Sequence, residues 1–253
     1  MQAMPFTFSH PAFAFPLKFI NPRWFSTTGL VLGSMAPDFE YFLTLEPHQA
    51  IGHSFTGLFL QGIPLCLLFA YLFHFYVKES LVLHLPSILE INRRGYDLLL
   101  SWGLYTFRDW FVYIISVIIG FLSHITLDAF THESGYMVRN LIILQNIVVG
   151  NLPVFKILQY TLSMIGILIT AGVIGLALSK TVSNKKMVST ITYKQKLYYW
   201  SFAIMSAVFI TICKLIFASS GNFIGILVVA PISGFCLGIL LISLFWNMKR
   251  HRT

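Results

Sequence analysis

The chain has 253 residues, of which 57% are hydrophobic and only 10% are charged. Soluble domains carry about 25% charged residues, so this composition and the mean hydropathy of +0.77 exclude an ordinary soluble enzyme and predict an integral membrane protein. The formal net charge is +8, but the basic residues are spread along the chain instead of gathering with aromatic residues on one face. That distribution does not favour nucleic acid as a partner.

The N-terminal segment before His53 predicts neither a signal peptide nor a membrane span. Residues 1–9 contain no basic residue, and prolines and basic residues then interrupt the apolar stretch that follows. Prolines inside such a stretch break a continuous helix. We therefore expect a loop-rich N-terminal cap with short helices, which enters the membrane only at His53.

Five windows in the rest of the chain are long and apolar enough to cross a bilayer as helices, which takes about 20 residues each. Asp128 and Lys214 are the charged residues inside them when histidine is counted as neutral. We expect an all-α polytopic membrane protein of about five transmembrane helices that forms a single membrane domain over residues 1–253. The windows are Phe55–Val77, Trp110–Phe130, Ile157–Ser179, Leu197–Ser219 and Phe223–Trp246.

The distribution of lysine and arginine predicts the orientation of these helices. With five spans, twelve of these residues lie in segments on one side of the membrane and five on the other. The richer side is expected to be cytoplasmic. This places the C-terminus in the cytoplasm, and the N-terminal cap and the loop of residues 132–156 on the outer side.

Three ionisable residues at the end of the second window and just after it share one helical face. His124, Asp128 and His132 recur every four residues, which stacks them along a helix about 6 Å apart. Ionisable groups at this depth are costly unless they pair, line a wet cavity or bind a metal. The His-x-x-x-Asp spacing lets one helical turn offer nitrogen and carboxylate ligands to one cation. The same residues also fit a hydrogen-bonded stripe that holds helices together.

Further candidate ligands lie near the start of the first window. Consecutive spans are antiparallel, so His53 is expected at the same membrane face as His132. Upstream of it, Asp38 could instead cap backbone amides of the turn that Pro37 begins, and His10 alone could be an ordinary loop histidine. A histidine and aspartate set without thiolates favours zinc, manganese or iron in a catalytic site with open positions. The candidate metal ligands are His10, Asp38, His53, His124, Asp128 and His132.

A cation in this set would give the site hydrolytic chemistry. It would lower the pKa of bound water and polarise a phosphoryl or acyl oxygen. A site at the membrane face favours an amphiphilic substrate in the lipid bilayer, such as a phospholipid or another lipid-linked phosphate. Asp128 is the central catalytic candidate because it can bridge two cations. Glu40 is the first candidate for the general base, with Glu46 and Glu133 as alternatives, although the sequence favours a solvated loop carboxylate at each of the three.

The order of these motifs resembles a known family. The motifs are Ser9-His10, the Gly-Ser-Met-Ala-Pro-Asp-Phe-Glu-Tyr segment of residues 33–41, Gly-His-Ser at residues 52–54, and Ser-His-x-x-x-Asp-x-x-x-His at residues 123–132. Over residues 4–135 they resemble the small bacterial membrane proteins grouped around YdjM, described as inner-membrane metal-dependent hydrolases. A sister family of unknown function with a Met-Pro-Phe-Thr start is more similar still. The resemblance implies a bacterial inner-membrane protein, and the lysine and arginine distribution then places the site on the periplasmic side. Residues 153–246 lie outside the resemblance and are expected to supply three further helices.

A more distant resemblance is to zinc-dependent phospholipase C and the related single-strand nucleases. It implies that Asp38, His53, His124 and Asp128 hold one zinc ion, with Asp128 bridging to a second ion that also takes His10. His132 would belong to a further metal. This chain departs from those enzymes because it has no later His-x-x-x-Glu pair. One or two divalent ions, zinc first among them, are therefore expected.

Two other functions remain compatible with the same residues. A transporter or ion-handling protein could use the cluster to bind a moving metal or to relay protons. The polar groups lie near one membrane face, however, and the last three windows show no matching inverted repeat, which transporters of many folds have. A non-catalytic membrane scaffold with a degenerate site is the third possibility.

Overall fold

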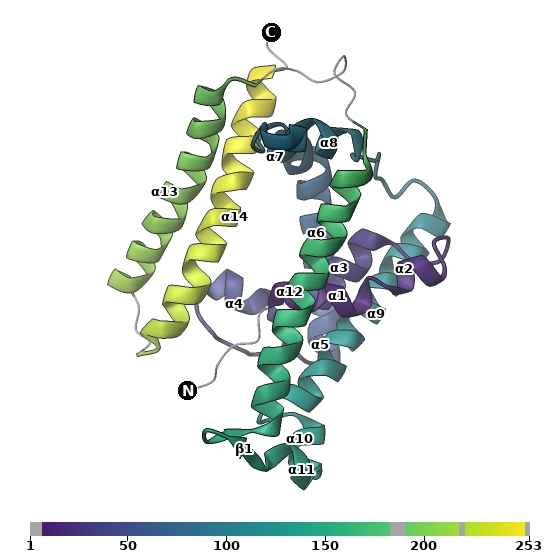
Figure 1. The fold of residues 1–253 in the computed structure, drawn as a ribbon, viewed down its shortest axis with the longest axis vertical. Helices are drawn as coiled ribbons and strands as arrows, with labels where there is room; N and C mark the ends of the chain where they lie inside the picture. The colour runs from purple at the N-terminus through teal and green to yellow at the C-terminus, as the bar shows by residue number, and fades with distance from the viewer. Residues whose placement is uncertain (1–6, 183–190, 218–220, 251–253) are drawn as a thin grey trace. The chain divides into compact units, whose positions relative to one another are not determined.

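The computed structural model describes residues 7–182, 191–217 and 221–250, and within them the chain is almost entirely helical (Figure 1). A two-stranded antiparallel hairpin, β1 (Ile147–Val149) with β2 (Leu152–Pro153), is the sheet in this part of the chain. Five of the described helices are long and apolar enough to cross a membrane, which confirms the predicted fold class. They cover Phe55–Leu83, Phe107–Asn140, Val154–Lys180, Tyr193–Phe217 and Phe223–Met248.

The first of these spans is a composite helix. It extends to Leu83, six residues beyond the predicted end at Val77, and two five-residue π-helical turns interrupt its α-helical parts. A π turn places an extra residue in the helical ladder and is frequent near functional sites. Its successive parts are α5 (Phe55–Gly57), η3 (Leu58–Gly62), α6 (Ile63–Leu72), η4 (Phe73–Val77) and α7 (Lys78–Leu83).

The chain divides into two compact units. The first comprises Met1–Phe39, Gln49–Leu67 and Gly103–Val173, and the second comprises Glu40–His48, Leu68–Trp102 and Ile174–Thr253. All six residues predicted as metal ligands fall in the first unit. Glu40, the predicted general base, falls in the second.

The first unit is built on α9 (Phe107–Thr131), which begins at a capping box. The Thr106 side chain accepts a hydrogen bond from the Asp109 backbone N–H, and the Asp109 carboxylate accepts one from the Thr106 N–H at 2.9 Å. The helix starts three residues before the predicted window and ends at Thr131, with His132 in extended conformation as its C-cap. Both ends are thus defined by local polar groups.

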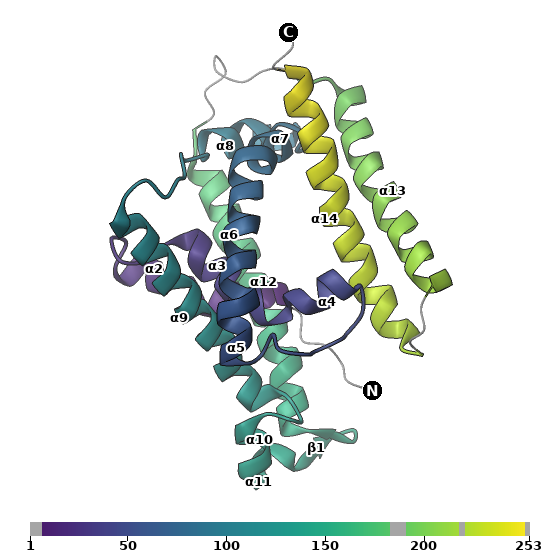
Figure 2. The same ribbon diagram turned by 180° about the vertical axis from the view of Figure 1, so that it is seen from behind.

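The N-terminal segment of the first unit forms short helices, as expected, and these lie beside α9 in both views (Figures 1 and 2). Glycines allow the closest approach. A Cβ atom on Gly33 would lie 2.3 Å from the backbone oxygen of Val117, and one on Gly120 would lie 2.5 Å from the backbone oxygen of Leu30. Small residues are what lets two helix backbones touch in a membrane protein. The helices are η1 (Thr7–Ser9), α1 (Pro11–Ala14), α2 (Leu17–Ile20), α3 (Thr27–Met35) and η2 (Ala36–Asp38).

After α9, the first unit continues through a short, compact apolar segment that leads into α12. Val138, Leu144 and Phe155 form a small core there, which holds together α10 (Tyr136–Asn140), α11 (Ile142–Gln145) and the start of α12 (Val154–Lys180). The strands β1 and β2 join α11 to α12. The third span therefore begins immediately after this segment.

The second unit contains the last two spans as an antiparallel helix pair (Figure 1). A Cβ atom on Gly234 or Gly238 would collide with the facing helix, and Tyr199 and Ser243 share a buried hydrogen bond of 2.8 Å between their hydroxyls. Lys214, one of the two charged residues in the predicted windows, forms an ion pair of 3.1 Å with Glu46. The helices of this unit are α4 (Phe39–Thr44), η5 (Ile88–Glu90), α8 (Ile91–Asp97), α13 (Tyr193–Phe217) and α14 (Phe223–Arg250), together with α7.

Candidate metal centre

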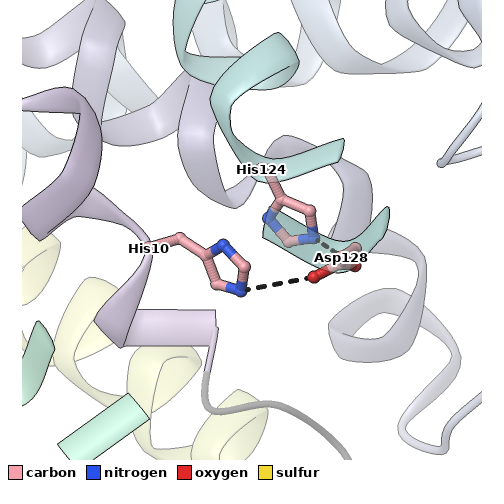
Figure 3. A group of neighbouring side chains, drawn as sticks. All are labelled: His10, His124 and Asp128. Atoms are coloured by element: carbon pink, nitrogen blue, oxygen red, sulfur yellow. Dashed lines mark ion pairs between the residues drawn. The ribbon is translucent and has the colours of Figure 1, made fainter. Parts of the chain in front are cut away.

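Asp128 lies at the centre of a histidine cluster in the first unit. Its Oδ2 atom is 3.1 Å from His124 Nε2 and 3.3 Å from His53 Nε2. Its Oδ1 atom is 3.3 Å from His132 Nδ1 and 3.8 Å from His10 Nε2. The two carboxylate oxygens therefore face two different pairs of imidazoles, and Figure 3 shows His10 and His124 turned toward this carboxylate.

A second carboxylate joins the cluster from η2. Asp38 is 1% exposed, and its Oδ1 atom lies 3.5 Å from His53 Nε2 and 3.7 Å from His124 Nε2. Its other oxygen accepts a 2.6 Å hydrogen bond from the Thr7 hydroxyl. Thr7 thus orients the Asp38 carboxylate and leaves Oδ1 directed at the two histidines. The structure brings together all six residues that the sequence singled out as metal ligands.

His124 is held in one orientation by the backbone of α3. Its Nδ1 atom lies 2.7 Å from the carbonyl oxygen of Ser34. A carbonyl only accepts hydrogen bonds, so Nδ1 carries a proton, and Nε2 is the nitrogen that faces Asp38 and Asp128. A backbone carbonyl on the far nitrogen is the usual support of a metal-binding histidine. Ser34 lies inside the motif of residues 33–41, but the sequence analysis assigned it no role.

The rings of His10 and His124 are stacked. Their centroids are 3.8 Å apart and their planes differ by 14°. An imidazole lone pair lies in the plane of its ring, so two nearly parallel rings cannot both direct their lone pairs at one cation. Burial, and then the neighbouring His124, hold the pKa of His10 well below its usual value, so His10 is a neutral imidazole at pH 7.

Three atoms that face the centre of the cluster lack hydrogen bonds. Asp38 Oδ1, His124 Nε2 and Asp128 Oδ1 are each buried and have no hydrogen-bond partner among the described residues. The 3.1 Å approach of His124 Nε2 to Asp128 is close enough for an ion pair but does not have hydrogen-bond geometry. Buried polar atoms are rarely left unsatisfied. The two carboxylate oxygens are electron donors, so a cation bound between them and His124 Nε2 would satisfy all three atoms together.

The third span contributes a residue that sequence reasoning missed. Gln159, on α12, is 2% exposed, and its Nε2 atom lies 3.3 Å from His132 Nε2. Its Oε1 atom accepts a 2.8 Å hydrogen bond from Lys156, so the amide nitrogen faces His132 and donates to it. His132 then carries its proton on Nδ1, which lies 3.2 Å from the Thr131 hydroxyl oxygen and 3.3 Å from Asp128 Oδ1. The available signal was an amide one turn into an otherwise apolar window.

This arrangement favours a positioning role for His132, because its Nδ1 atom faces the Asp128 carboxylate at 3.3 Å while Gln159 holds its other nitrogen. Its assignment as a metal ligand stays a prediction. A small cavity of about 10 Å³ lies beside His10 and Gln159, which is about the space of a single water molecule. Polar and apolar groups from the N-terminal segment, α9 and α12 line this cavity: Ser9, His10, Phe13, Leu127, Thr131, Gln159, Leu162 and Ser163.

The candidates for the general base lie in different places. Glu40 is buried in the first turn of α4, in the second unit, so its catalytic role stays a prediction. Glu46 forms the ion pair with Lys214, which gives it a structural partner. Glu133 belongs to the first unit and is exposed in the turn after α9.

Comparisons with known proteins assign a family but no activity. Neither the curated proteins nor the solved structures contain a match to this chain. A family model described as a domain of unknown function, DUF4184, matches residues 4–244, nearly the whole chain. The similarity to the YdjM group of hydrolases therefore stays a prediction from motifs. The chain belongs to the family defined by the domain of unknown function DUF4184.

Proposed function

We propose that this protein is a membrane-embedded, metal-dependent hydrolase that acts on a phosphodiester or a lipid-linked phosphate. The observation that carries the proposal is the set of buried electron-donor atoms around Asp128. Within the first unit, imidazole nitrogens and carboxylate oxygens from four separate segments converge, and three of these atoms lack hydrogen-bond partners among the described residues. Such a set is costly in an apolar surrounding without a cation.

The principal cation position is formed by Asp38, His53, His124 and Asp128. Their facing atoms are two imidazole nitrogens and two carboxylate oxygens, separated by 3.1 to 3.7 Å. Four mixed nitrogen and oxygen ligands suit zinc. Two carboxylates with neutral imidazoles also balance the charge of a divalent ion, which favours its burial.

A second, weaker position lies on the other side of Asp128. His10 is stacked on His124, so it would serve a separate cation that shares only the Oδ1 atom of Asp128. Fewer protein ligands leave coordination positions open, which is the feature of a catalytic rather than a structural site. The proposal is therefore one tightly bound ion and one exchangeable ion.

The residues of the chain would prepare this site for hydrolysis. A bound divalent cation supplies Lewis-acid chemistry and lowers the pKa of water toward neutrality. Ser34 fixes the tautomer of His124, and His132, backed by Gln159, holds Asp128 in place. Lys156, next to Gln159, places a positive charge where an anionic substrate group could bind.

The position of the cluster supports an amphiphilic substrate. Asp128 lies three residues before the end of α9, so the cluster lies near one end of this helix. A substrate that lies in the bilayer surface, with its phosphate at headgroup depth, could reach the site at that level. The lysine and arginine distribution supports a periplasmic face in a bacterial inner membrane.

Metal content and activity test this proposal together. The purified full chain is analysed for zinc, manganese and iron and assayed on bis(p-nitrophenyl) phosphate and on short-chain phosphatidylcholine. We expect at least one zinc per chain, and activity that a chelator removes and zinc restores. Asp38→Asn should lower both, whereas Asp97→Asn, an exposed aspartate in α8, should change neither. If the protein binds metal but shows no hydrolysis, and if zinc enters proteoliposomes that contain it, a transporter would replace the hydrolase as the proposed function. Absence of metal would refute the proposal.

A further inference from the structure

The N-terminal helices form a hairpin that follows the length of α9. We name residues 11–35, which include α1, α2 and α3, the N-terminal hairpin. Just before it, His10 Nε2 lies 3.8 Å from Asp128, near the end of α9. At its turn, the carbonyl oxygen of Arg23 accepts a 3.3 Å hydrogen bond from Arg108, the second residue of α9. The first arm thus runs from one end of α9 toward the other.

The second arm returns parallel to α9. The Ser26 N–H donates a 2.8 Å hydrogen bond to the Ser116 hydroxyl, and eight residues later the Ser34 carbonyl meets His124, which is eight residues beyond Ser116. Because both segments advance by eight residues between these two contacts, α3 and α9 run side by side in the same direction. The close packing at Gly33 and Gly120 lies along this contact.

The part of α9 between Arg108 and Asp128 matches the thickness of a bilayer core. Arg108 and Asp128 are 20 positions apart in α9, which is about 30 Å of helix. The hydrocarbon core of a bilayer is also about 30 Å thick. The helix α9 belongs to a candidate membrane span. The hairpin follows this helix from Asp128 to within one side-chain length of Arg108, so it follows the helix through the membrane.

From this placement we propose that the N-terminal hairpin is a re-entrant membrane element. It enters from the face that carries the metal cluster and rests its turn among the phospholipid headgroups of the opposite leaflet. The inference is independent of any metal and of the proposed hydrolase activity. It also changes the expectation that the N-terminal segment remains a cap outside the membrane until His53.

The backbone carbonyls of the turn have hydrogen-bond partners, as its proposed depth in the membrane requires. Non-helical backbone inside a membrane is tolerated only where its polar groups are satisfied. The Lys18 ammonium donates to the carbonyls of Pro22 at 2.6 Å and Phe25 at 2.7 Å, and Arg108 donates to that of Arg23. Two cationic side chains thus satisfy three carbonyls between α2 and α3.

The exposed side chains of the turn fit a headgroup environment. Phe19 and Ile20 are 67% and 77% exposed, and Trp24, 53% exposed, lies 5.9 Å from the Arg108 guanidinium. Tryptophan with neighbouring basic residues is typical of the interface between acyl chains and headgroups. The apolar rings suit contact with acyl chains, and the neighbouring cations of Lys18, Arg23 and Arg108 suit contact with headgroup phosphates.

The proposed placement also strengthens the charge asymmetry of the chain. The N-terminal cap had contributed Lys18 and Arg23 to the poorer side of the membrane. Moving both to the other side raises its twelve lysines and arginines to fourteen and lowers the five to three. The orientation with a cytoplasmic C-terminus therefore agrees better with the positive-inside distribution when the hairpin is re-entrant.

Cysteine labelling tests the position of the turn. In full-length protein whose native cysteines are replaced, single cysteines are placed at Asn21, in the turn, and at Ser134, in the exposed turn after α9. An impermeant maleimide is applied to intact spheroplasts and to inverted membrane vesicles. We expect Ser134→Cys to react only in spheroplasts and Asn21→Cys only in inverted vesicles. Reaction of both from the same side, or reaction of Asn21→Cys only after denaturation, would overturn the proposal.

Tryptophan fluorescence gives a second measurement that needs no cysteine replacement. The protein is reconstituted into phosphatidylcholine vesicles that contain headgroup nitroxide-labelled lipid. Trp24→Phe should reduce the quenched share of the emission, because it removes an exposed ring at headgroup depth. Trp200→Phe should not, since the Trp200 indole donates to the His84 carbonyl at 2.9 Å inside the second unit. An unchanged quenched share in Trp24→Phe would place Trp24 away from the headgroups and overturn the proposal.

Discussion

The Nδ1 atom of His124 lies 2.7 Å from the carbonyl oxygen of Ser34, although 90 positions separate the two residues. This contact joins the middle of a membrane span to the N-terminal hairpin. It also determines which nitrogen of His124 faces the two carboxylates. The local packing of α3 on α9 and the chemistry of the cluster therefore depend on the same backbone contact.

The first prediction concerns Asp128, whose two oxygens face different histidines. Asp128→Asn keeps the size of the side chain and one oxygen but removes the charge. Loss of a residue that only supports a metal ligand lowers metal affinity about 10–100-fold. Because Asp128 is itself a proposed ligand, its replacement should lower metal affinity at least as much, while membrane insertion is retained. Elemental analysis of purified protein measures the loss, with Asp97→Asn as the control. Full metal occupancy in Asp128→Asn would favour the alternative in which these residues only hold helices together.

The second prediction concerns Gln159, which acts through His132. Gln159→Leu retains the volume but removes the donor to His132 Nε2, so the orientation and tautomer of the ring that faces Asp128 are no longer fixed. Zinc affinity should fall about 10–100-fold with little change in thermal stability. Ser163→Ala, one turn further along the same face of α12, should leave the affinity within about twofold. A competition titration with a zinc chelator distinguishes the two variants, and equal affinities would remove Gln159 from the site.

The third prediction concerns the contact between α3 and α9. A Cβ atom on Gly120 would lie 2.5 Å from the Leu30 oxygen and 2.7 Å from the Ser34 nitrogen, whereas one on Gly172 would meet nothing within 4 Å. Gly120→Ala should cost about 1–3 kcal/mol because backbone atoms must move, and it should weaken zinc binding by displacing Ser34. Gly172→Ala should do neither. Thermal unfolding in detergent with and without zinc measures both effects, and equal melting temperatures for the two variants would contradict the packing.

The fourth prediction is a pH dependence in the second unit. His84 is buried, stacked on Tyr199 at 4.2 Å, and its Nδ1 atom lies 2.7 Å from the Ser80 carbonyl. Burial, and to a lesser degree Lys196, lower the pKa of His84 from its usual value near 6.5. The unfolded chain therefore binds a proton that the folded chain does not, and stability falls as the pH drops below 6.5.

This contribution should amount to at most about 1.4 kcal/mol per pH unit and should be absent above pH 7. His84→Phe keeps the stacking on Tyr199 but removes the titration. The difference in unfolding free energy between wild type and variant should therefore change between pH 7 and pH 5 and stay constant above pH 7. A constant difference over the whole range would show that His84 does not titrate on unfolding.

Much of the fold follows from local sequence patterns. A membrane span needs only a sufficient run of apolar residues, so all five spans could be located from the sequence. The four-residue spacing of His124, Asp128 and His132 likewise places them on one helical face, because the helical repeat is a local property. Antiparallel succession of spans then brings His53 to the same membrane face.

Only the tertiary structure decides which distant residues complete the site. Gln159 reaches His132 because α12 approaches α9, and Ser34 reaches His124 because Gly33 and Gly120 let two backbones touch. Neither contact leaves a periodic signal, since its partners lie far apart in the chain. Glu40 shows the converse: it lies two residues from Asp38, yet it belongs to the other unit. Hydrophobic length and helical period thus determine the spans and the first ligands, while backbone contacts across the fold determine their supporting partners.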